Sequence, residues 1–292
     1  MGELLVEPLD APLGAAVSGL APGALAPAVV DELHTALGAN GVLVFSGRTW
    51  SPAEFVALGR AFGELEILPE PDKRHPDHPE IFNLTNVRSD GTLVYADEPQ
   101  AVFLRGTERW HTDSSFRAVP CLCTMLYAIE VPPTGGETQF ADMVAGLDEL
   151  TRIAPELSAE VAGAGVVHSY EYSRANNPGR LEPMTDAERR KYPPVVHPLI
   201  RSHAQGRRSL YLGGHASHLE GRDEDVGRAL LAEIEGIATA PDVIYTHRWQ
   251  PSDLVIWDNR TVLHRLRPYD IANHRRSMLR ITVAGTEAPR SG

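Results

Sequence analysis

The chain has 292 residues, of which 42% are hydrophobic and 23% charged, and its formal net charge is −12 at pH 7. This length can bury a full hydrophobic core, and the composition is ordinary for a globular protein. The acidic balance argues against a nucleic-acid-binding protein, which needs a broad basic face, although a local arginine pocket can still bind a small anion. No signal-peptide pattern and no apolar run of about 18 residues occurs, so we expect a cytoplasmic protein that does not enter a membrane.

The first third of the chain predicts two helices around a buried strand. Residues 27–37 have helical spacing and end before Asn40-Gly41, and residues 41–45 are typical of a buried strand. Ser51 and Glu54 form a capping box with Pro52 at the first helical position, which predicts a helix to about residue 62. Residues 69–80 predict a loop. Residues 89–107 show little periodicity, and we interpret them as a mobile loop or lid over a site.

The only two cysteines, Cys121 and Cys123, follow in the middle of the chain. In a strand both side chains would share one face, a geometry that does not suit a disulfide between them. Two cysteines are also too few for a disulfide scaffold, so we expect free, buried thiols.

The rest of the chain predicts short strands with a few helices. Helices are expected at 141–153, 155–162 and 223–237, and an insert at 173–194 contains one short helix at 186–191. Strands are expected at 166–170, 195–201, 209–212, 243–246, 254–257 and 278–284. No shift in composition marks a boundary, so we expect one domain, residues 1–292, that is mainly β with flanking helices and forms a two-sheet jelly roll.

Three residues have the spacing and chemistry of a metal site. In a strand, His111 and Asp113 point to the same face, while Thr112 points away. His264, from a distant strand, would add a second imidazole. Two histidines and one carboxylate form the facial triad that leaves coordination positions open on a non-haem Fe(II).

Two further segments indicate an anion site. If residues 274–283 form a strand, Arg276 and Arg280 share one face with Met278, where buried charge needs an anionic partner. The alternative is a pair of surface arginines on a sheet edge. Gly135-Gly136 predicts the turn of a hairpin, and Thr138 in the next strand could offer a hydroxyl to an anion.

The order of these motifs resembles the TauD/TfdA family of Fe(II)- and 2-oxoglutarate-dependent dioxygenases. The motifs are His111-Thr112-Asp113, Gly135-Gly136-Glu137-Thr138, Trp257-Asp258-Asn259-Arg260 followed by His264, and Arg275-Arg276 followed by Arg280. The resemblance extends from residues 13–19 to the last strand, and residues 213–221 and 257–265 look like the branch that acts on aryloxyacetates. It implies a double-stranded β-helix, the cupin-like form of the jelly roll, which uses Fe(II), 2-oxoglutarate and O2.

The resemblance also implies a role for each candidate residue. His111, Asp113 and His264 would hold the iron; Arg276 and Thr138 would bind the far carboxylate of 2-oxoglutarate; and Arg280 would hold the anionic group of the prime substrate. Further candidates for substrate contacts are Asn83, Asn86, Arg105, Thr107 and His215. Taurine enzymes of the family carry Asn four residues before the first ligand, where this chain has Thr107, which argues against taurine.

The resulting hypothesis is a dioxygenase that oxidises a small anionic organic acid. The best candidate is an aryloxyacetate such as 2,4-dichlorophenoxyacetate (2,4-D), cleaved to a phenol and glyoxylate with succinate and CO2 as coproducts. Hydroxylation or desaturation of another carboxylate or of an alkyl sulfonate is the alternative. A zinc hydrolase using the same three ligands and a non-catalytic β-domain are more distant alternatives. The family often forms dimers or tetramers, so a homo-oligomer is possible.

Overall fold

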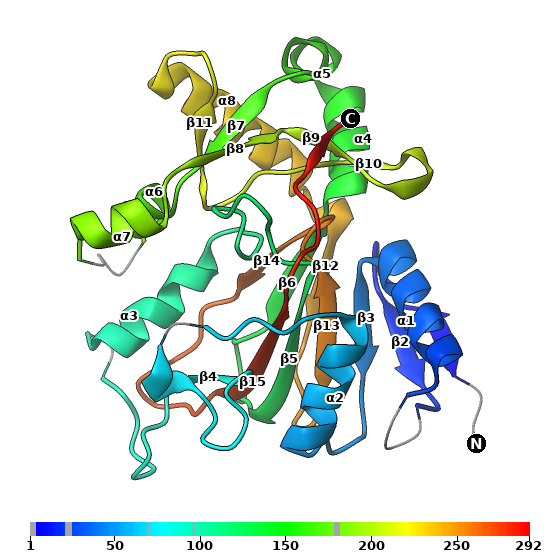
Figure 1. Ribbon diagram of the computed structural model, residues 1–292, viewed down its shortest axis with the longest axis vertical. Helices are drawn as coiled ribbons and strands as arrows, with labels where there is room; N and C mark the ends of the chain where they lie inside the picture. Colours follow the sequence, from blue (N-terminus) through cyan, green and yellow to red (C-terminus); the bar gives the residue numbers. More distant parts are fainter. Residues whose placement is uncertain (1–3, 21–24, 69, 96, 178–181) are drawn as a thin grey trace.

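Two β-sheets packed face to face form the centre of the computed structural model, which describes residues 4–20, 25–68, 70–95, 97–177 and 182–292 (Figure 1). The larger sheet has the strand order β1 (Leu5–Pro8), β2 (Ala15–Ser18), β3 (Val42–Phe45), β13 (Leu254–Asp258), β5 (Cys123–Glu130), β15 (Ser277–Val283) and β4 (Phe82–Thr85). The smaller sheet consists of β12 (Ile244–His247), β6 (Thr138–Asp142) and β14 (Val262–Leu266). This is the jelly roll that the sequence predicted.

The alternation of side chains along β15 shows how the sheets divide the core. Met278 points inward and packs with Phe140 and Trp257 between the two sheets. Ile281 and Val283 point to the opposite face of the larger sheet. Because both faces are covered, the strands at the centre of this sheet are apolar on both sides.

Two helices cover the outer face of the larger sheet (Figure 1). They are α1 (Pro27–Asn40) and α2 (Pro52–Phe62), and both predictions for this region are confirmed. The backbone N–H of Glu54 donates to the Ser51 hydroxyl, and the Glu54 carboxylate accepts from the Ser51 backbone. The capping box therefore fixes where α2 begins.

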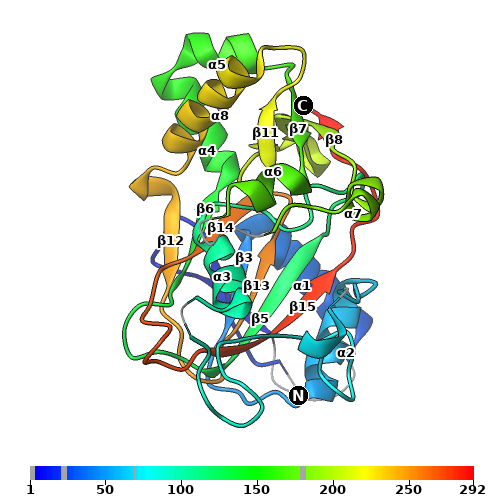
Figure 2. The same cartoon turned by 90° about the vertical axis from the view of Figure 1, so that its left-hand side faces the viewer.

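A second layer of helices and short strands stands above the two sheets in Figure 2. It contains α4 (Met143–Ile153), α5 (Pro155–Val161) and α8 (Glu224–Ala238). Its strands form two small sheets, one of β11 (Ala216–Leu219), β7 (Gly165–His168) and β8 (Val195–Pro198), and one of β10 (Arg208–Leu210), β9 (Ile200–Ser202) and β16 (Arg290–Ser291). Leu150, Val166 and Leu231 belong to the apolar core that joins these elements.

Short helices complete the described chain. The α-helices are α3 (Pro99–Arg105), α6 (Tyr170–Ala175) and α7 (Asp186–Lys191), and the 3₁₀ helices are η1 (Pro71–Lys73), η2 (Gly106–Glu108), η3 (Ala204–Gly206) and η4 (Pro241–Val243). None of the helices in the described residues is long and apolar enough to cross a membrane. Cys121 and Cys123 are free and buried, as expected.

Several predictions in the middle of the chain were wrong. Residues 89–107 are not a loop throughout, because α3 and η2 occupy their C-terminal part. The strand expected at 166–170 ends at His168, since the Ser169 hydroxyl caps α6. Within the insert at 173–194, residues 178–181 lie outside the described residues, and α7 is the helix that was predicted.

Two predicted strand connections were also wrong. The strand expected at 195–201 is two strands, β8 and β9, which belong to different sheets and flank Leu199. Gly135-Gly136 forms a turn with positive φ at both residues, but it leads from β5 to β6 in the opposite sheet. The turn therefore connects the two layers of the jelly roll, and no hairpin forms there.

Candidate metal centre and active-site cavity

His111, Asp113 and His264 lie together at one end of the two central sheets. Their ligand atoms are all within 4.8 Å of one another. Among the described residues, they are the one group of three or more potential metal ligands that lie this close together. The backbones of the two histidines pair, with His111 N–H donating to His264 O at 3.0 Å and His264 N–H to His111 O at 2.8 Å. Asp113 follows in a turn, and the Thr112 side chain points away to donate to Asn259 O at 2.6 Å. The i, i+2 spacing thus places the ligands as predicted.

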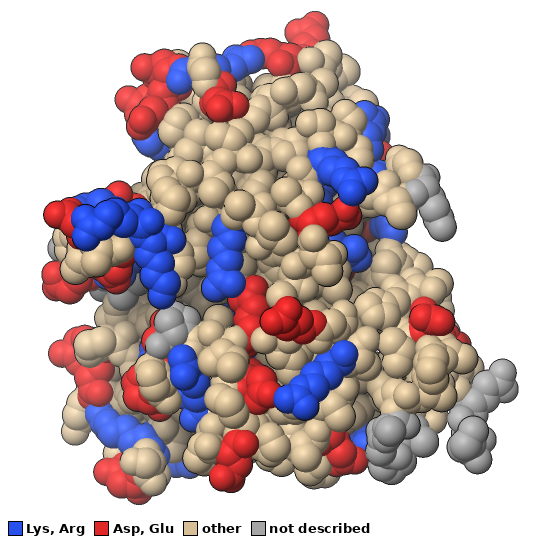
Figure 3. All heavy atoms as spheres, in the orientation of Figure 1, with Lys and Arg blue, Asp and Glu red and all other residues tan. Residues whose placement is uncertain are grey.

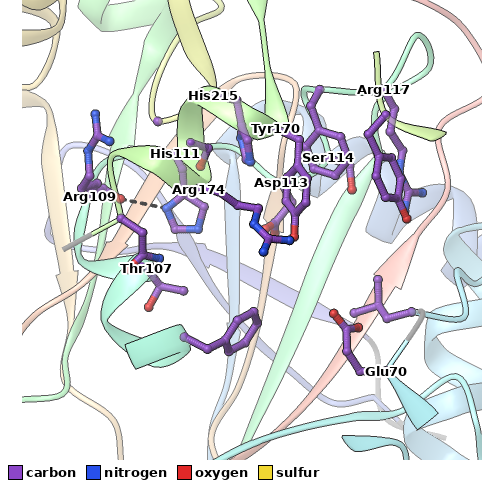
Figure 4. Close-up of a pocket in the computed structure, with 18 of the residues that line it drawn as sticks. Glu70, Thr107, Arg109, His111, Asp113, Ser114, Arg117, Tyr170, Arg174 and His215 are labelled. Atoms are coloured by element: carbon purple, nitrogen blue, oxygen red, sulfur yellow. Dashed lines mark hydrogen bonds between the residues drawn. The ribbon is translucent and has the colours of Figure 1, made fainter. Parts of the chain in front are cut away.

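A contact behind the His111 ring and the burial of both imidazoles prepare them to bind a metal. His111 Nδ1 lies 2.8 Å from the carbonyl oxygen of Arg109 (Figure 4). A carbonyl can only accept, so Nδ1 carries the proton and Nε2 is free to act as a ligand. Burial lowers the pKa of both His111 and His264, which keeps both rings neutral. Within the described part of the chain, the buried Nδ1 of His264 has no hydrogen-bond partner.

The carboxylate of Asp113 is held from two sides. The Thr124 hydroxyl donates to Oδ2 at 2.7 Å, and Arg280 Nη2 lies 3.0 Å from Oδ1. Burial opposes ionisation of Asp113, but its neighbours, above all the Arg280 guanidinium, outweigh it and hold the pKa of the carboxyl below its ordinary value. The Asn259 amide donates to the Thr124 hydroxyl at 2.9 Å and fixes its orientation. Two neutral imidazoles and an oriented carboxylate are a donor set that suits Fe(II).

Thr124→Val should weaken Fe(II) binding by about 10- to 100-fold, as is usual when a group that orients a ligand is lost. The hydroxyl that orients Asp113 disappears, while the volume of the side chain stays nearly the same. Thr282 is the matched control, because it pairs with Thr124 on the neighbouring strand and its buried hydroxyl has no partner among the described residues. Titration of Fe(II) into both variants measures the effect; equal affinities would show that the Thr124 hydroxyl is not needed.

Arg276 is a buried cation without a carboxylate partner in the described residues. Burial lowers the pKa of its guanidinium to about 10, and its Nε has no hydrogen-bond partner there. Its backbone N–H donates to the Asn86 side chain at 2.8 Å, which fixes the start of β15. Because a buried charge needs a counterion, this position suits an anionic ligand.

Gly136 lies near this arginine, and Thr138 follows the glycine two residues later at the start of β6. A Cβ at Gly136 would come 3.5 Å from Arg276 Cδ, so the glycine leaves room for the arginine side chain. The buried Thr138 hydroxyl accepts from Trp249 Nε1 at 2.9 Å, which leaves its own proton available for a ligand.

A cavity of about 450 Å³ opens beside His111 and Asp113 (Figure 4). Its aromatic lining residues are Phe82, Phe103, Phe116, Tyr170 and Tyr192, and its cationic lining residues are Arg109, Arg117, Arg174, Lys191 and Arg280. Sequence reasoning identified only Arg280 from these two sets. The aromatic residues come from separate elements, so only the fold shows that they belong to one site.

The other candidate substrate contacts divide into two groups. Thr107 and His215 line the cavity, whereas Asn83, Asn86 and Arg105 are not among its lining residues. Asn83 follows Phe82 in β4, so when Phe82 faces the cavity Asn83 faces the opposite side. Asn86 is fully buried and donates to the carbonyls of Ile271 and His274, both at 2.8 Å. It braces the segment before Arg276.

Charges are mixed on the face shown in Figure 3, with acidic and basic side chains interspersed. Basic residues gather over α7, whose last three residues are Arg189, Arg190 and Lys191. Lys191 also lines the cavity.

A jelly roll that holds two imidazoles and one carboxylate beside a cavity has the architecture of a mononuclear non-haem iron enzyme. Comparison with known proteins defines the family. The family model "Taurine catabolism dioxygenase TauD, TfdA family" matches residues 5–282. The chain belongs to the TauD/TfdA family.

Individual relatives agree with this assignment. The chain is 40% identical to the α-ketoglutarate-dependent 2,4-dichlorophenoxyacetate dioxygenase of Burkholderia sp. (strain RASC) over 267 residues, covering 90% of this chain and 88% of that protein. It is 33% identical over 291 residues to the (S)-phenoxypropionate/α-ketoglutarate dioxygenase of Sphingobium herbicidovorans, covering 97% and 96% of the two proteins. The crystal structure of AAD-2 in complex with Mn(II) and N-oxalylglycine superposes with a TM-score of 0.87, at 34% identity and 99% and 100% coverage.

The protein is therefore a 2-oxoglutarate-dependent non-haem iron dioxygenase, with Fe(II) as its metal, 2-oxoglutarate as its cosubstrate and O2 as its oxidant. The zinc-hydrolase and non-catalytic interpretations of the sequence are wrong, because family membership assigns the triad to an oxygenase.

Proposed function

We propose that the protein oxidises an aryloxyalkanoate, with an aryloxyacetate such as 2,4-D as the best candidate. Hydroxylation of the carbon between the ether oxygen and the carboxylate gives a hemiacetal that falls apart to a phenol and glyoxylate. One oxygen atom of O2 enters this carbon and the other enters succinate, which forms from 2-oxoglutarate with loss of CO2. When bound, the iron and its cosubstrate supply the oxidising power, and the protein supplies binding and orientation.

The observation that carries this proposal is the cavity beside the triad, in which aromatic walls and cationic side chains occur together. An aryloxyacetate has an aromatic ring and a carboxylate separated by two atoms, so it can satisfy both kinds of lining at once. The two relatives described above act on acids of this kind, according to their names. A small alkyl sulfonate would leave much of the aromatic wall without a contact.

We assign the residues as follows. His111, Asp113 and His264 hold the iron, and Arg276 with Thr138 binds the far carboxylate of 2-oxoglutarate. Arg280 meets the anionic group of the prime substrate, which its place on the cavity wall supports. Thr107 and His215, which also line the cavity, contact the substrate.

The test begins without oxygen. Fe(II) and then 2-oxoglutarate are added to metal-free protein while the visible absorption is recorded, and a weak charge-transfer band is expected. Addition of 2,4-D should shift this band, and admission of O2 should then give phenol and glyoxylate in equal amounts. A band that no aryloxyacetate shifts, or oxygen uptake without glyoxylate, would exclude this substrate class. Folded, iron-loaded protein without any band would contradict the assigned cosubstrate site.

We also propose that residues 1–292 act as one cytoplasmic domain that assembles as a dimer or tetramer and binds neither nucleic acid nor membranes. A single calorimetric unfolding transition and a light-scattering mass of two or four protomers are the expected results.

A further inference from the structure

A second cavity, of about 470 Å³, lies directly beyond the one beside the metal centre. The two cavities share four lining residues, Phe116, Arg117, Lys191 and Tyr192. The far side of the second cavity is apolar and includes Ile67, Pro193 and Val195. The shared residues therefore form a wall between a cavity that contains the triad and one that does not.

The centre of this wall is a set of packed rings. The Phe116 and Tyr192 rings meet edge to face with centroids 5.6 Å apart. Tyr170 packs against both, at 4.7 Å from Phe116 and 5.4 Å from Tyr192. Three rings in mutual contact form a more rigid boundary than flexible aliphatic side chains would.

The Phe116 side of the wall is fixed to the metal-binding turn. Ser114 has a positive φ of 58°, and its carbonyl accepts from Arg117 N–H at 2.9 Å. His197 Nε2 lies 3.0 Å from the carbonyl oxygens of both Ser115 and Arg117, so its N–H holds the backbone on either side of Phe116. Moving Phe116 would disturb the turn that carries Asp113.

The backbone on the Tyr192 side of the wall belongs to α7 and not to the metal-binding turn. Tyr192 is the residue after α7, and its backbone N–H donates to Glu188 O at 2.8 Å. The Tyr192 hydroxyl makes no hydrogen bond to another described residue. Tyr192 therefore contributes to the wall only through the contacts of its ring with Phe116 and Tyr170. The side chain can therefore be shortened without leaving a buried polar group unpaired.

We propose that the Tyr192 ring, packed on Phe116, limits the length of the acid that the active site accepts. The inference rests on the function proposed above and adds the residue that sets substrate size. Without this ring, the two cavities become one, and the apolar second cavity can hold a second aromatic ring attached to the first. In the wild-type protein, single-ring acids fit and acids extended by another ring are rejected.

The test compares phenoxyacetate with 4-phenylphenoxyacetate. Tyr192→Ala should raise the ratio of kcat/KM for the longer acid over the shorter one by about tenfold or more, since filling a hydrophobic pocket discriminates by this amount. Tyr192→Phe keeps the ring and should retain the wild-type ratio. Tyr172→Ala, in α6 but lining neither cavity, is the matched control and should also retain it.

A second readout does not need turnover. The Kd of each acid is measured, without oxygen, from the shift of the charge-transfer band of protein loaded with Fe(II) and 2-oxoglutarate. Tyr192→Ala should tighten binding of the longer acid by a similar factor. If this variant misfolds, as circular dichroism would show, Tyr192→Leu provides a smaller side chain that keeps apolar contact with Phe116.

The possible failures are distinguishable. A folded, iron-loaded Tyr192→Ala or Tyr192→Leu with unchanged ratio and Kd overturns the proposed wall, as does a Tyr192→Phe that behaves like Tyr192→Ala. Wild-type protein that turns over no aryloxyacetate overturns the proposed function, and the two Kd values alone then decide whether Tyr192 limits the cavity.

Discussion

Asp113→Ala should remove iron binding and dioxygenase activity together, and His111→Ala should do the same. Each variant deletes one of three ligands in a group whose donor atoms lie within 4.8 Å of one another. A bound metal supplies several kcal/mol of transition-state stabilisation, so activity should fall by on the order of 10³-fold or more. Asp113→Ala also leaves the Arg280 guanidinium without its carboxylate partner, which adds a structural cost that His111→Ala does not have.

Iron content after anaerobic reconstitution and succinate formation are the two measurements. His218→Ala is the matched control, because His218 lies on β11 and does not line the cavity, and it should keep full iron content. Asp113→Asn keeps the shape of the side chain but removes its charge, so it separates the effect of charge on iron binding from the effect of shape. Stoichiometric iron in both Asp113→Ala and His111→Ala would count against the assigned triad.

Substitutions of Arg276 and Arg280 should raise the KM values of two different ligands, although the two residues are only four positions apart. Loss of a charge-assisted partner of a desolvated anion costs about 2–5 kcal/mol, which is about 30-fold or more in affinity. Arg276→Gln should therefore raise the KM for 2-oxoglutarate by at least about 30-fold. Arg280→Ala should instead raise the KM for the prime substrate far more than that for 2-oxoglutarate.

The position of Arg280 requires a control measurement of iron content. Arg280 also contacts the Asp113 carboxylate, so the iron content of Arg280→Ala must be measured before its kinetics are interpreted. With iron content restored by excess Fe(II), the effect on the prime substrate should remain. Equal increases in both KM values would refute the assignment of separate roles to the two arginines.

The grouping of the metal triad could be predicted because it depends on short-range periodicity, whereas the roles of the two arginines stay predictions. The i, i+2 rule places His111 and Asp113 on one side, and the same rule places Arg280 with Met278 on the inner face of β15, which Arg276 directly precedes. Long, strongly patterned elements such as α2 and α8 were predicted for the same reason. The jelly roll itself followed from the number of short strands and from the resemblance to a known family.

Other features could not be predicted, because their physical causes are not visible in the local sequence pattern. Helix α3 has seven residues, and its buried side chains are only Ala101 and Leu104, which is too few for a visible period. Residues 195–201 have the composition of one strand, but Leu199 lies where the chain passes from one sheet to another. Asn86 has a side chain that could contact a ligand, yet the fold buries it to support the backbone before Arg276.

The backbone pairing of His111 with His264 has a consequence for how the enzyme matures. His111 lies in the first half of the chain on an isolated β-bridge, and β14, which carries His264, is followed only by β15 and β16. A contact between such distant segments forms only after a large loop has closed. A chain that lacks β14 therefore has no complete set of three ligands, so the full iron site can form only after nearly the whole protein has been synthesised. Iron occupancy consequently reports completed folding, and a chain truncated before residue 264 should bind no iron at this site.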